Sequence, residues 1–488
     1  MSRFKNIIIS VFSCLILLYI TSLKFVYAYK YAATWDMVDF ALGVVQFDLL
    51  QMQPHFPGYP YFILGGMLFS NFAETPQLAL SYFNSFLMLS TIIPIYLFAR
   101  EYLSKENSLL LTAFVHSISY LIIMGVQPMS EGAAVAVLAW YIWSLKLAIK
   151  KNRFSIRLLP LFLFSVLLGI RFSYLLLGVG ILFMWWNTIK SAKGGWITVI
   201  KESVIAVVFQ FLWVSALASN VGGWETFIQI ANGFSDGHFN EWGGTSFSEN
   251  TSTLSRGMTL LFTNVFWTGL FSKSYFLMVI GGFILVYLGF QIIFNRKLFL
   301  HPMLLIMMAA YFLWAWFGQN IDKPRHILPL ILLACLYMGI WLLKNNKISI
   351  TMIFIVFLLA QVFIGVNLLK EQYQQTPAVY QLANDLSVAD NPFILYTWEE
   401  TRVFEYIKSP FEHKRILTYT QFLEDITYAK NKQIYITNRV KEGFIAQGAV
   451  ENDFVKVKSF HSNPLFDPVY ASIELYEWKG ETVNERKN

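Results

Sequence analysis

The sequence predicts an α-helical polytopic membrane protein with about eleven transmembrane helices, interfacial helices in the first external loop and a small C-terminal external α/β domain. Hydrophobic residues make up 56% of the 488 residues and charged residues only 14%, which is too apolar for a soluble domain. Apolar runs recur up to residue 370, and the chain then becomes charged with short strand-like runs. We therefore expect a transmembrane domain at 1–370 and an extracytoplasmic α/β domain at 371–488.

The expected spans follow the apolar runs. They lie at 7–27, 76–99, 108–126, 132–149, 203–219, 274–294, 298–317, 327–343 and 350–369, with two more within 158–189. In the C-terminal domain we expect strands at 393–397, 433–437 and 472–476 and helices at 377–386 and 420–429.

The net charge of +7 needs no nucleic acid partner, because lysines and arginines cluster beside the apolar runs, as the positive-inside rule expects for cytoplasmic loops. Cys14 and Cys335 both lie within apolar runs. Neither a structural disulfide nor a thiol metal site is therefore expected.

The basic segments also predict which side of the cell membrane each loop faces. The spans themselves should contact membrane lipids. With the basic loops at 100–105 and 146–157 in the cytoplasm, residues 29–75 are external. The N-terminus is then cytoplasmic and the C-terminal domain extracytoplasmic. For the first apolar run, 7–27, a cleaved signal peptide is the alternative to a membrane span.

Several segments do not fit simple spans. Residues 61–72 are only about twelve, too few to cross the hydrocarbon core, so they should lie along the outer leaflet, and 259–271 resembles a second interfacial helix. The run 158–189 is broken by Arg171 and has basic flanks on both sides, which favours a hairpin with Arg171 at its external tip. One long tilted helix with a snorkelling arginine is the alternative.

The external segment 220–257 is polar, rich in glycine and without evident structure. Loops of this length are uncommon unless they bind something. Within it, Asp236 and His238 lack a completed metal-ligand set, so we interpret them as solvated loop residues. The sequon at Asn250 is interpreted as chance.

The stretch 34–66 holds the most distinctive pattern in the chain. Asp36 and Asp39 stand three apart in a short amphipathic run, so a helix would direct both carboxylates from one face. The run PHFPGYP follows, and its prolines and glycine should fix a rigid loop around His55.

Other ionisable residues gather at the external ends of the predicted spans. These are Glu131, Arg171, Arg325 and His326. The spans themselves are almost free of charge at mid-depth, which indicates chemistry at the outer surface rather than ion-coupled transport.

The order of acid pair, rigid histidine loop and apolar run resembles the first external loop of the GT-C superfamily of polytopic glycosyltransferases, which includes protein mannosyltransferases and aminoarabinose transferases. The matching residues are Asp36, Asp39, Phe40, Ala41, Gly43, Pro54, His55, Pro57, Gly58, Tyr59 and Pro60. Phe56 stands where the pattern more often has a second proline. The resemblance covers the first part of the chain and a segment near Arg325, and it does not extend to the C-terminal domain.

Three further segments carry the resemblance. Ser130-Glu131-Gly132 is similar to the second external acid of the superfamily, and Arg171 to the basic residue near the outer end of its middle hairpin. The run from Lys323 to Pro329 is similar to its Arg-Tyr-x-x-Pro segment, with His326 in the place of the tyrosine.

The resemblance implies a hexosyl or pentosyl transferase that moves a sugar from a polyprenyl-phosphate carrier to an envelope acceptor at the outer face. No nucleotide-binding loop is evident, which agrees with a lipid-linked donor. Such a transfer needs a base and cations for the leaving phosphate, and arginine binds phosphate through paired donors. The implied roles are catalytic for Asp36 and Asp39, phosphate binding for Arg325, His326 and Arg171, and support for His55 and Glu131.

A divalent cation beside the phosphate could take oxygen ligands from Asp36, Asp39 or Glu131, and no other cofactor is expected. Two other functions remain open. One is a translocase of lipid-linked saccharides without covalent chemistry, and the other a scaffold whose C-terminal domain is the working part. Each site residue also has a purely structural interpretation, such as helix capping or interface anchoring.

Overall fold

The computed structural model describes residues 2–191, 195–248, 251–295, 301–344, 348–429 and 431–480. Asn250 and residues 298–300, at the start of a predicted span, lie outside the described residues. The chain forms two compact units. We call Met1–Lys30 with Phe40–Tyr373 the membrane unit, and Tyr31–Asp39 with Gln374–Asn488 the C-terminal unit. The division falls inside one helix, α2, after Asp39.

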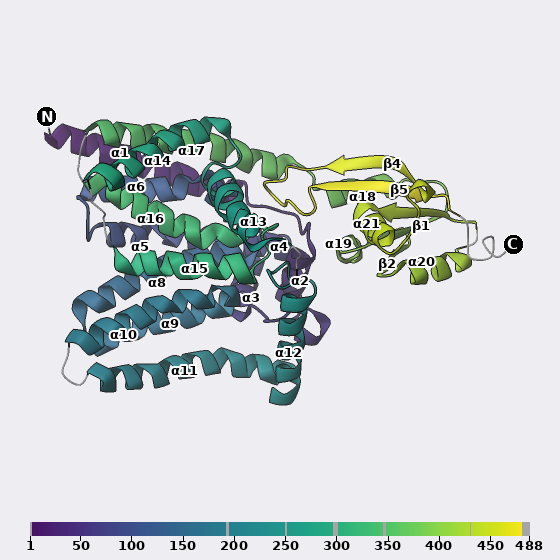
Figure 1. The fold of residues 1–488 in the computed structure, drawn as a ribbon, viewed down its shortest axis with the longest axis horizontal. Helices are drawn as coiled ribbons and strands as arrows, with labels where there is room; N and C mark the ends of the chain where they lie inside the picture. Colours follow the sequence, from purple (N-terminus) through teal and green to yellow (C-terminus); the bar gives the residue numbers. More distant parts are fainter. Residues whose placement is uncertain are drawn as a thin grey trace. The chain divides into compact units, whose positions relative to one another are not determined.

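The membrane unit is helical, and most of its long helices run alongside one another in Figure 1, whereas α12 runs across them. Its first half contains α1 (Ser2–Val26), α2 (Trp35–Val45), η1 (Leu49–Gln51), α3 (Pro60–Phe69), η2 (Ser70–Phe72), α4 (Pro76–Ser90), α5 (Ile92–Ala99), α6 (Lys105–Ser117), α7 (Ser119–Met124), α8 (Ser130–Lys151) and α9 (Phe154–Ile170). Its second half contains η3 (Phe172–Gly178), α10 (Val179–Ser191), α11 (Gly195–Asn220), α12 (Trp224–Asn240), α13 (Thr253–Met258), η4 (Thr259–Leu270), α14 (Tyr275–Asn295), α15 (Pro302–Gly318), η5 (Pro324–Ile327), α16 (Leu328–Lys344) and α17 (Ile348–Gln374).

The structure confirms a multi-pass membrane fold. Among the described residues, seven helices are long and apolar enough to cross a membrane, or up to eight if the bent pair Thr253–Leu270 and Tyr275–Gln291 forms one span. The expected total of about eleven transmembrane helices stays a prediction, because it includes helices too short to meet this criterion. Two of these, α9 and α15, are apolar and 17 residues long, and the run predicted at 108–126 is divided between α6 and α7 at Ile118.

Two irregular segments have the predicted form. The short apolar run after PHFPGYP is α3, a helix of 10 residues with Pro60 at its first position, where proline lacks only an N–H that would be unbonded anyway. The run 158–189 is interrupted at Arg171, whose extended backbone (φ −154°, ψ 100°) ends α9. Arg171 thus separates two helical segments.

The prediction that 220–257 lacks regular structure is wrong for the first half of this segment, because residues 224–240 form the helix α12. Its apolar side chains face the neighbouring helix α11 and the PHFPGYP loop, and ring contacts join Phe56 to Phe227 (5.6 Å) and Phe234 (5.2 Å). The glycines and polar residues in this run hid a one-sided apolar pattern.

The C-terminal unit contains a five-stranded mixed sheet in the order β2-β1-β3-β5-β4. Its elements are α18 (Ala378–Leu386), β1 (Phe393–Thr397), α19 (Glu400–Tyr406), β2 (His413–Arg415), α20 (Tyr419–Asp425), η6 (Ile426–Tyr428), β3 (Gln433–Thr437), α21 (Asn438–Ala446), η7 (Glu451–Asp453), β4 (Phe454–His461) and β5 (Ser472–Trp478). Strands β1, β2 and β3 are parallel, and β5 is antiparallel to both β3 and β4. The predicted α/β domain is confirmed.

A core of buried side chains joins one face of this sheet to α20 and α21. Ile394 and Ile436 on the strands pack with Phe422 and Phe444 on the two helices. Strands β1 and β3 have the predicted bounds, whereas β2 and β4 were not predicted. β2 has only three residues, too few for a pattern. β4 has a Val-Lys alternation that is typical of a strand and that the sequence analysis did not use, although most of its side chains are exposed.

Candidate active site

The PHFPGYP loop of the membrane unit packs on the second half of α2. A Cβ at Gly43 would lie 2.9 Å from the Pro54 side chain and 3.0 Å from its backbone nitrogen, so only glycine allows this approach. Gly58 has a φ of +93°, which also favours glycine. Both glycines of the pattern therefore have a local structural reason.

The loop holds His55 against two aromatic rings. His55 Nε2 and the Tyr59 hydroxyl form a hydrogen bond of 3.2 Å, and Phe40 contacts both rings at centroid distances of 5.3 and 4.8 Å. The supporting role expected for His55 stays a prediction, and Tyr59 is the side chain that it orients.

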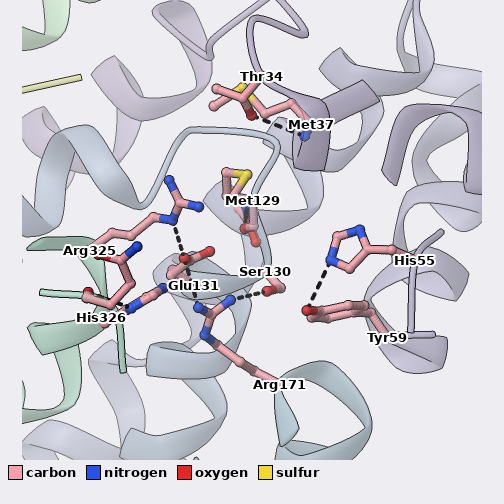
Figure 2. Close-up of polar contacts among 12 residues, drawn as sticks. Thr34, Met37, His55, Tyr59, Met129, Ser130, Glu131, Arg171, Arg325 and His326 are labelled. Atoms are coloured by element: carbon pink, nitrogen blue, oxygen red, sulfur yellow. Dashed lines mark hydrogen bonds and ion pairs between the residues drawn. The ribbon is translucent and has the colours of Figure 1, made fainter. Parts of the chain in front are cut away.

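A buried ionic cluster joins three residues that the sequence analysis singled out separately. The Glu131 carboxylate lies 2.8 Å from Arg325 Nε and 3.1 Å from Arg171 Nη2. Figure 2 shows the carboxylate between the two guanidinium groups. Arg171 also donates to the Ser130 hydroxyl at 2.8 Å. We call Glu131, Arg171 and Arg325 the arginine cluster.

Each member of the arginine cluster stands where a helix begins or ends. Glu131 is in the first turn of α8, where the helix dipole favours a negative charge. Arg171 lies directly after α9, and Arg325 lies in η5, ahead of α16. All three side chains are largely buried, with Glu131 only 1% exposed.

Two guanidinium groups approach one carboxylate in this cluster, and buried hydrogen-bond donors lie beside them. Within the described residues, Arg171 Nε and the Tyr174 hydroxyl are buried without a hydrogen-bond partner. The Tyr59, Tyr174 and Tyr311 hydroxyls all lie within electrostatic range of Arg171. Since buried donors in folded proteins are nearly always satisfied, the cluster is suited to an anion with several acceptor oxygens.

The loop before Arg325 is held by side chains that sequence reasoning missed. Arg256, which is 1% exposed, donates to the carbonyl oxygens of Trp316 (2.7 Å), Gly244 (2.8 Å) and Gln319. Asn264 donates to the Ile321 oxygen at 2.7 Å. These bonds fix the approach to Arg325, and no sequence signal marked Arg256 or Asn264.

His326 belongs to the same loop and is bonded within it. Its Nδ1 donates to the Asn320 oxygen at 3.2 Å, and its carbonyl oxygen accepts from the Tyr311 hydroxyl at 2.8 Å. In a neutral ring Nε2 is then an acceptor. The phosphate-binding role expected for His326 stays a prediction. This tautomer does not favour it, because Nε2 then has no hydrogen to donate to a phosphate oxygen.

The predicted acid pair lies in the C-terminal unit, where its two members differ. Asp39 is fully buried and accepts from Arg402 Nε at 2.9 Å, whereas Asp36 lies half-buried in the first turn of α2. The Asp39 carboxylate is therefore already engaged in an ion pair within the unit. The pairing with Arg402, far away in the sequence, could not be predicted.

For a divalent cation, Asp36, Asp39 and Glu131 stay candidate ligands only. Across the part of the chain that the structure describes, no group of three or more His, Cys, Asp or Glu side chains could hold a metal ion. Glu131 is already engaged by two guanidinium groups, which compete with a cation for its oxygens.

The sequence matches no known family profile and no curated protein. The fold does match solved structures. ArnT from Cupriavidus metallidurans in the apo state gives a TM-score of 0.54 at 10% identity, over 98% of this chain and 98% of that one. The same enzyme bound to undecaprenyl phosphate gives 0.53 at 12% identity, over 96% and 98%.

A second relative in fold is the oligosaccharyltransferase of Archaeoglobus fulgidus in the apo form. It gives a TM-score of 0.50 at 11% identity, over 89% of this chain and 69% of that one. Both proteins are GT-C glycosyltransferases. The chain therefore has the fold of the GT-C membrane glycosyltransferases, as the sequence pattern in its first external loop predicts.

Proposed function

We propose that the protein is a membrane glycosyltransferase that transfers a sugar from a polyprenyl-phosphate donor to an acceptor at the outer face of the cell membrane. The fold of the whole chain supports the class of enzyme. The observation that carries the proposal is the arginine cluster, in which two buried guanidinium groups meet at one carboxylate, while Arg171 Nε and the Tyr174 hydroxyl are buried donors without a partner among the described residues.

The cluster suits the leaving group of this reaction. When the bond between the sugar C1 and the phosphate oxygen breaks, the electron pair stays on the phosphate, which gains negative charge. Arg171 and Arg325 offer planar paired donors to phosphate oxygens, and their burial strengthens the interaction with charge that develops during the reaction. Glu131 holds the two guanidinium groups beside each other until the anion arrives.

Two hydroxyl groups extend this site. Tyr174 can donate its unbonded O–H to a phosphate oxygen, and Tyr59, bonded to His55, lies within electrostatic range of Arg171. The PHFPGYP loop then serves the phosphate site by fixing the Tyr59 ring. This gives His55 a supporting role rather than a catalytic one.

Asp36 is the proposed base. It takes the proton from the acceptor hydroxyl as that oxygen forms its bond to C1, so that a glycosidic bond to the acceptor replaces the bond between C1 and the phosphate oxygen. Asp39 is already bonded to Arg402, so we assign it the positioning of the first turn of α2. A divalent cation is not required by this scheme, because guanidinium groups neutralise the phosphate.

The donor is proposed to be lipid-linked because the reaction is expected outside the cytoplasm, where sugar nucleotides are absent. The topology predicted from the basic loops gives a cytoplasmic N-terminus and an extracytoplasmic C-terminal unit. A translocase without covalent chemistry is not favoured, since the solved structures that share the fold are glycosyltransferases.

The test is a transfer assay with purified protein and radiolabelled polyprenyl-phosphate hexoses and pentoses, scored by label that leaves the lipid fraction. Asp36→Asn should abolish transfer while the protein still accumulates and keeps its thermal stability. Asp236→Asn is the matched control, because Asp236 is exposed and accepts a hydrogen bond from Asn240 on its own helix. Full activity of Asp36→Asn, or no release of any label by the wild type, would overturn the proposal.

A further inference from the structure

The carboxyl ends of the three parallel strands in the C-terminal unit form a second cluster of charge and aromatic surface. Thr397 at the end of β1 is aligned with Arg415 at the end of β2, and β3 ends beside β1 at Thr437. Open α/β sheets bind ligands beyond the carboxyl ends of their strands. This edge is therefore the first part of the unit in which to look for a ligand.

Arg415 stands at this edge with its guanidinium against two tryptophans. Its central carbon lies 4.6 Å from the centre of the Trp398 ring and 5.0 Å from that of Trp35. The residue is exposed. Among the described residues of the chain it has no carboxylate or hydrogen-bond partner, whereas the neighbouring Arg402 is bonded to Asp39.

Both tryptophans are held in place by other contacts. The Trp398 backbone N–H donates to Glu400 Oε2 at 2.9 Å, and its ring packs on the core of the unit. Trp35 follows a segment anchored by the Tyr31–Tyr380 ring contact (4.9 Å) and precedes Asp39, which is bonded to Arg402.

A long exposed arginine normally loses considerable side-chain entropy when it binds a ligand. Here the two rings already restrict the guanidinium by cation–π contact, while its N–H edges stay without protein acceptors. Such a preorganised group binds an anion at a lower entropic cost, and a planar guanidinium matches the oxygens of a phosphate.

We propose that Arg415, held by Trp35 and Trp398, forms a second ligand site in the C-terminal unit, and that this site binds a phosphate group. The phosphate can belong to a soluble sugar phosphate or to a polyprenyl phosphate in the membrane, and the chemistry of recognition is the same for both. The site lies wholly within the C-terminal unit. It does not depend on the transferase reaction or on the arginine cluster.

Hydrogen–deuterium exchange of the full-length protein in lipid nanodiscs tests the proposal, because its readout is local. One arm adds hexose 1-phosphate to nanodiscs of neutral lipid, and the other places undecaprenyl phosphate in the nanodisc. In at least one arm, peptides that cover 396–402 and 413–417 should become protected. Arg415→Gln should raise the half-saturating concentration of the ligand by about tenfold or more, which is the loss of affinity expected when a charged hydrogen bond is removed.

Arg439→Gln is the matched control, since Arg439 is exposed in the same unit but pairs with Glu442 at 3.3 Å. It should bind as the wild type does. Arg415→Lys should bind weakly, because lysine lacks the paired donors. Absence of protection in both arms, or equal protection in wild type and Arg415→Gln, would overturn the second site. Neither result bears on the sugar-transfer assay, which reports on Asp36 and the arginine cluster.

Discussion

The two ends of α9 carry buried ionic groups of opposite character. Near its start, Arg157 faces Glu202 on α11 with contacts of 2.5 and 2.9 Å. Asn152 accepts from the same guanidinium at 3.2 Å, and Trp185 donates to Glu202 at 2.8 Å. One cation meets one anion here, and Asn152 and Trp185 add hydrogen bonds to the pair. After the last turn, Arg171 instead shares Glu131 with Arg325.

The difference indicates what each end is for. Burial alone does not separate them, because both sets of side chains are largely removed from solvent. Hydrogen bonding does. The Arg157–Glu202 pair has no buried side-chain atom without a hydrogen bond, whereas Arg171 Nε and the adjacent Tyr174 hydroxyl have no hydrogen-bond partner among the described residues and can donate to an anion. The Arg157–Glu202 pair at the start of α9 therefore has a structural role, whereas the arginine cluster after its last turn is suited to binding an anionic ligand.

The largest expected effect is on stability, at the structural end. Glu202→Ala leaves the Arg157 guanidinium buried without its anion, which costs about 3–5 kcal/mol. Thermal unfolding of the detergent-solubilised protein should show this loss. The paired change Arg157→Met with Glu202→Leu should recover most of it, because apolar residues often replace a buried ion pair without a penalty. If the double variant is as unstable as Glu202→Ala, charge pairing does not explain this end of the helix.

The next effect is on turnover, at the other end. Arg325→Ala leaves Glu131 paired with Arg171, so the protein should stay folded, but transfer should fall about a hundredfold to a thousandfold through loss of charge stabilisation. Arg325→Lys should be intermediate, since it keeps the charge but not the planar donors.

Lys323→Ala is the control for this change, because Lys323 stands at the start of the same short helix and makes no contact with Glu131. It should transfer nearly as well as the wild type. Equal losses in Lys323→Ala and Arg325→Ala would mean that local positive charge matters, rather than the arginine cluster.

The sequence predicted the members of the arginine cluster but not their contacts. Arg171 was recognisable because a charge interrupts an apolar run, and Arg325 because its segment resembles the Arg-Tyr-x-x-Pro run of the GT-C superfamily. That both meet Glu131 depends on how α8, α9 and α16 pack, which no local pattern encodes. The Arg157–Glu202 pair was missed for the same reason, since each partner looks like an ordinary charge beside a span.

The acid pair and α12 illustrate two further limits. The spacing of Asp36 and Asp39 correctly predicted that both lie on one helix. It could not distinguish their roles, which differ because Asp39 is paired with Arg402. In α12, glycine and polar residues suggested a loop, although one face of the helix is apolar enough to pack. In both cases long-range packing overrides the local signal.

A smaller effect on turnover is expected at Arg256, which donates hydrogen bonds to three carbonyl oxygens around the loop that leads to Arg325. Arg256→Gln should lower kcat by about tenfold to a hundredfold through misplacement of that loop. Arg256→Lys should restore part of it.

A purely structural role predicts a different result for Arg256. In that case the fraction of folded protein would fall while kcat per folded molecule stayed constant. Measuring active-site occupancy by bound donor alongside turnover separates the two outcomes.

The smallest effect is expected for an ion pair that is much more exposed to solvent than those at the two ends of α9. This is the pair of Lys414 and Asp425 in the C-terminal unit. Burial alone would raise the pKa of the Asp425 carboxyl, but hydrogen bonds from Lys414 (2.8 and 2.9 Å) and Tyr396 (2.6 Å) outweigh it and hold the pKa below its ordinary value of 3.8. A carboxyl whose folded pKa is depressed adds stability above its unfolded pKa and loses it as the pH falls through the folded pKa.

Asp425→Asn should therefore destabilise the C-terminal unit at pH 7, by under about 1 kcal/mol because Lys414 is well exposed, and by less at acidic pH. Urea-dependent pulse proteolysis of the full-length protein, with thermolysin at neutral pH and pepsin in acid, measures both values. Glu442→Gln, which breaks a more exposed pair with Arg439, should change neither. If Asp425→Asn cost as much as Glu202→Ala, charge pairing would stabilise this protein regardless of burial, and the contrast between the two ends of α9 would lose its physical basis.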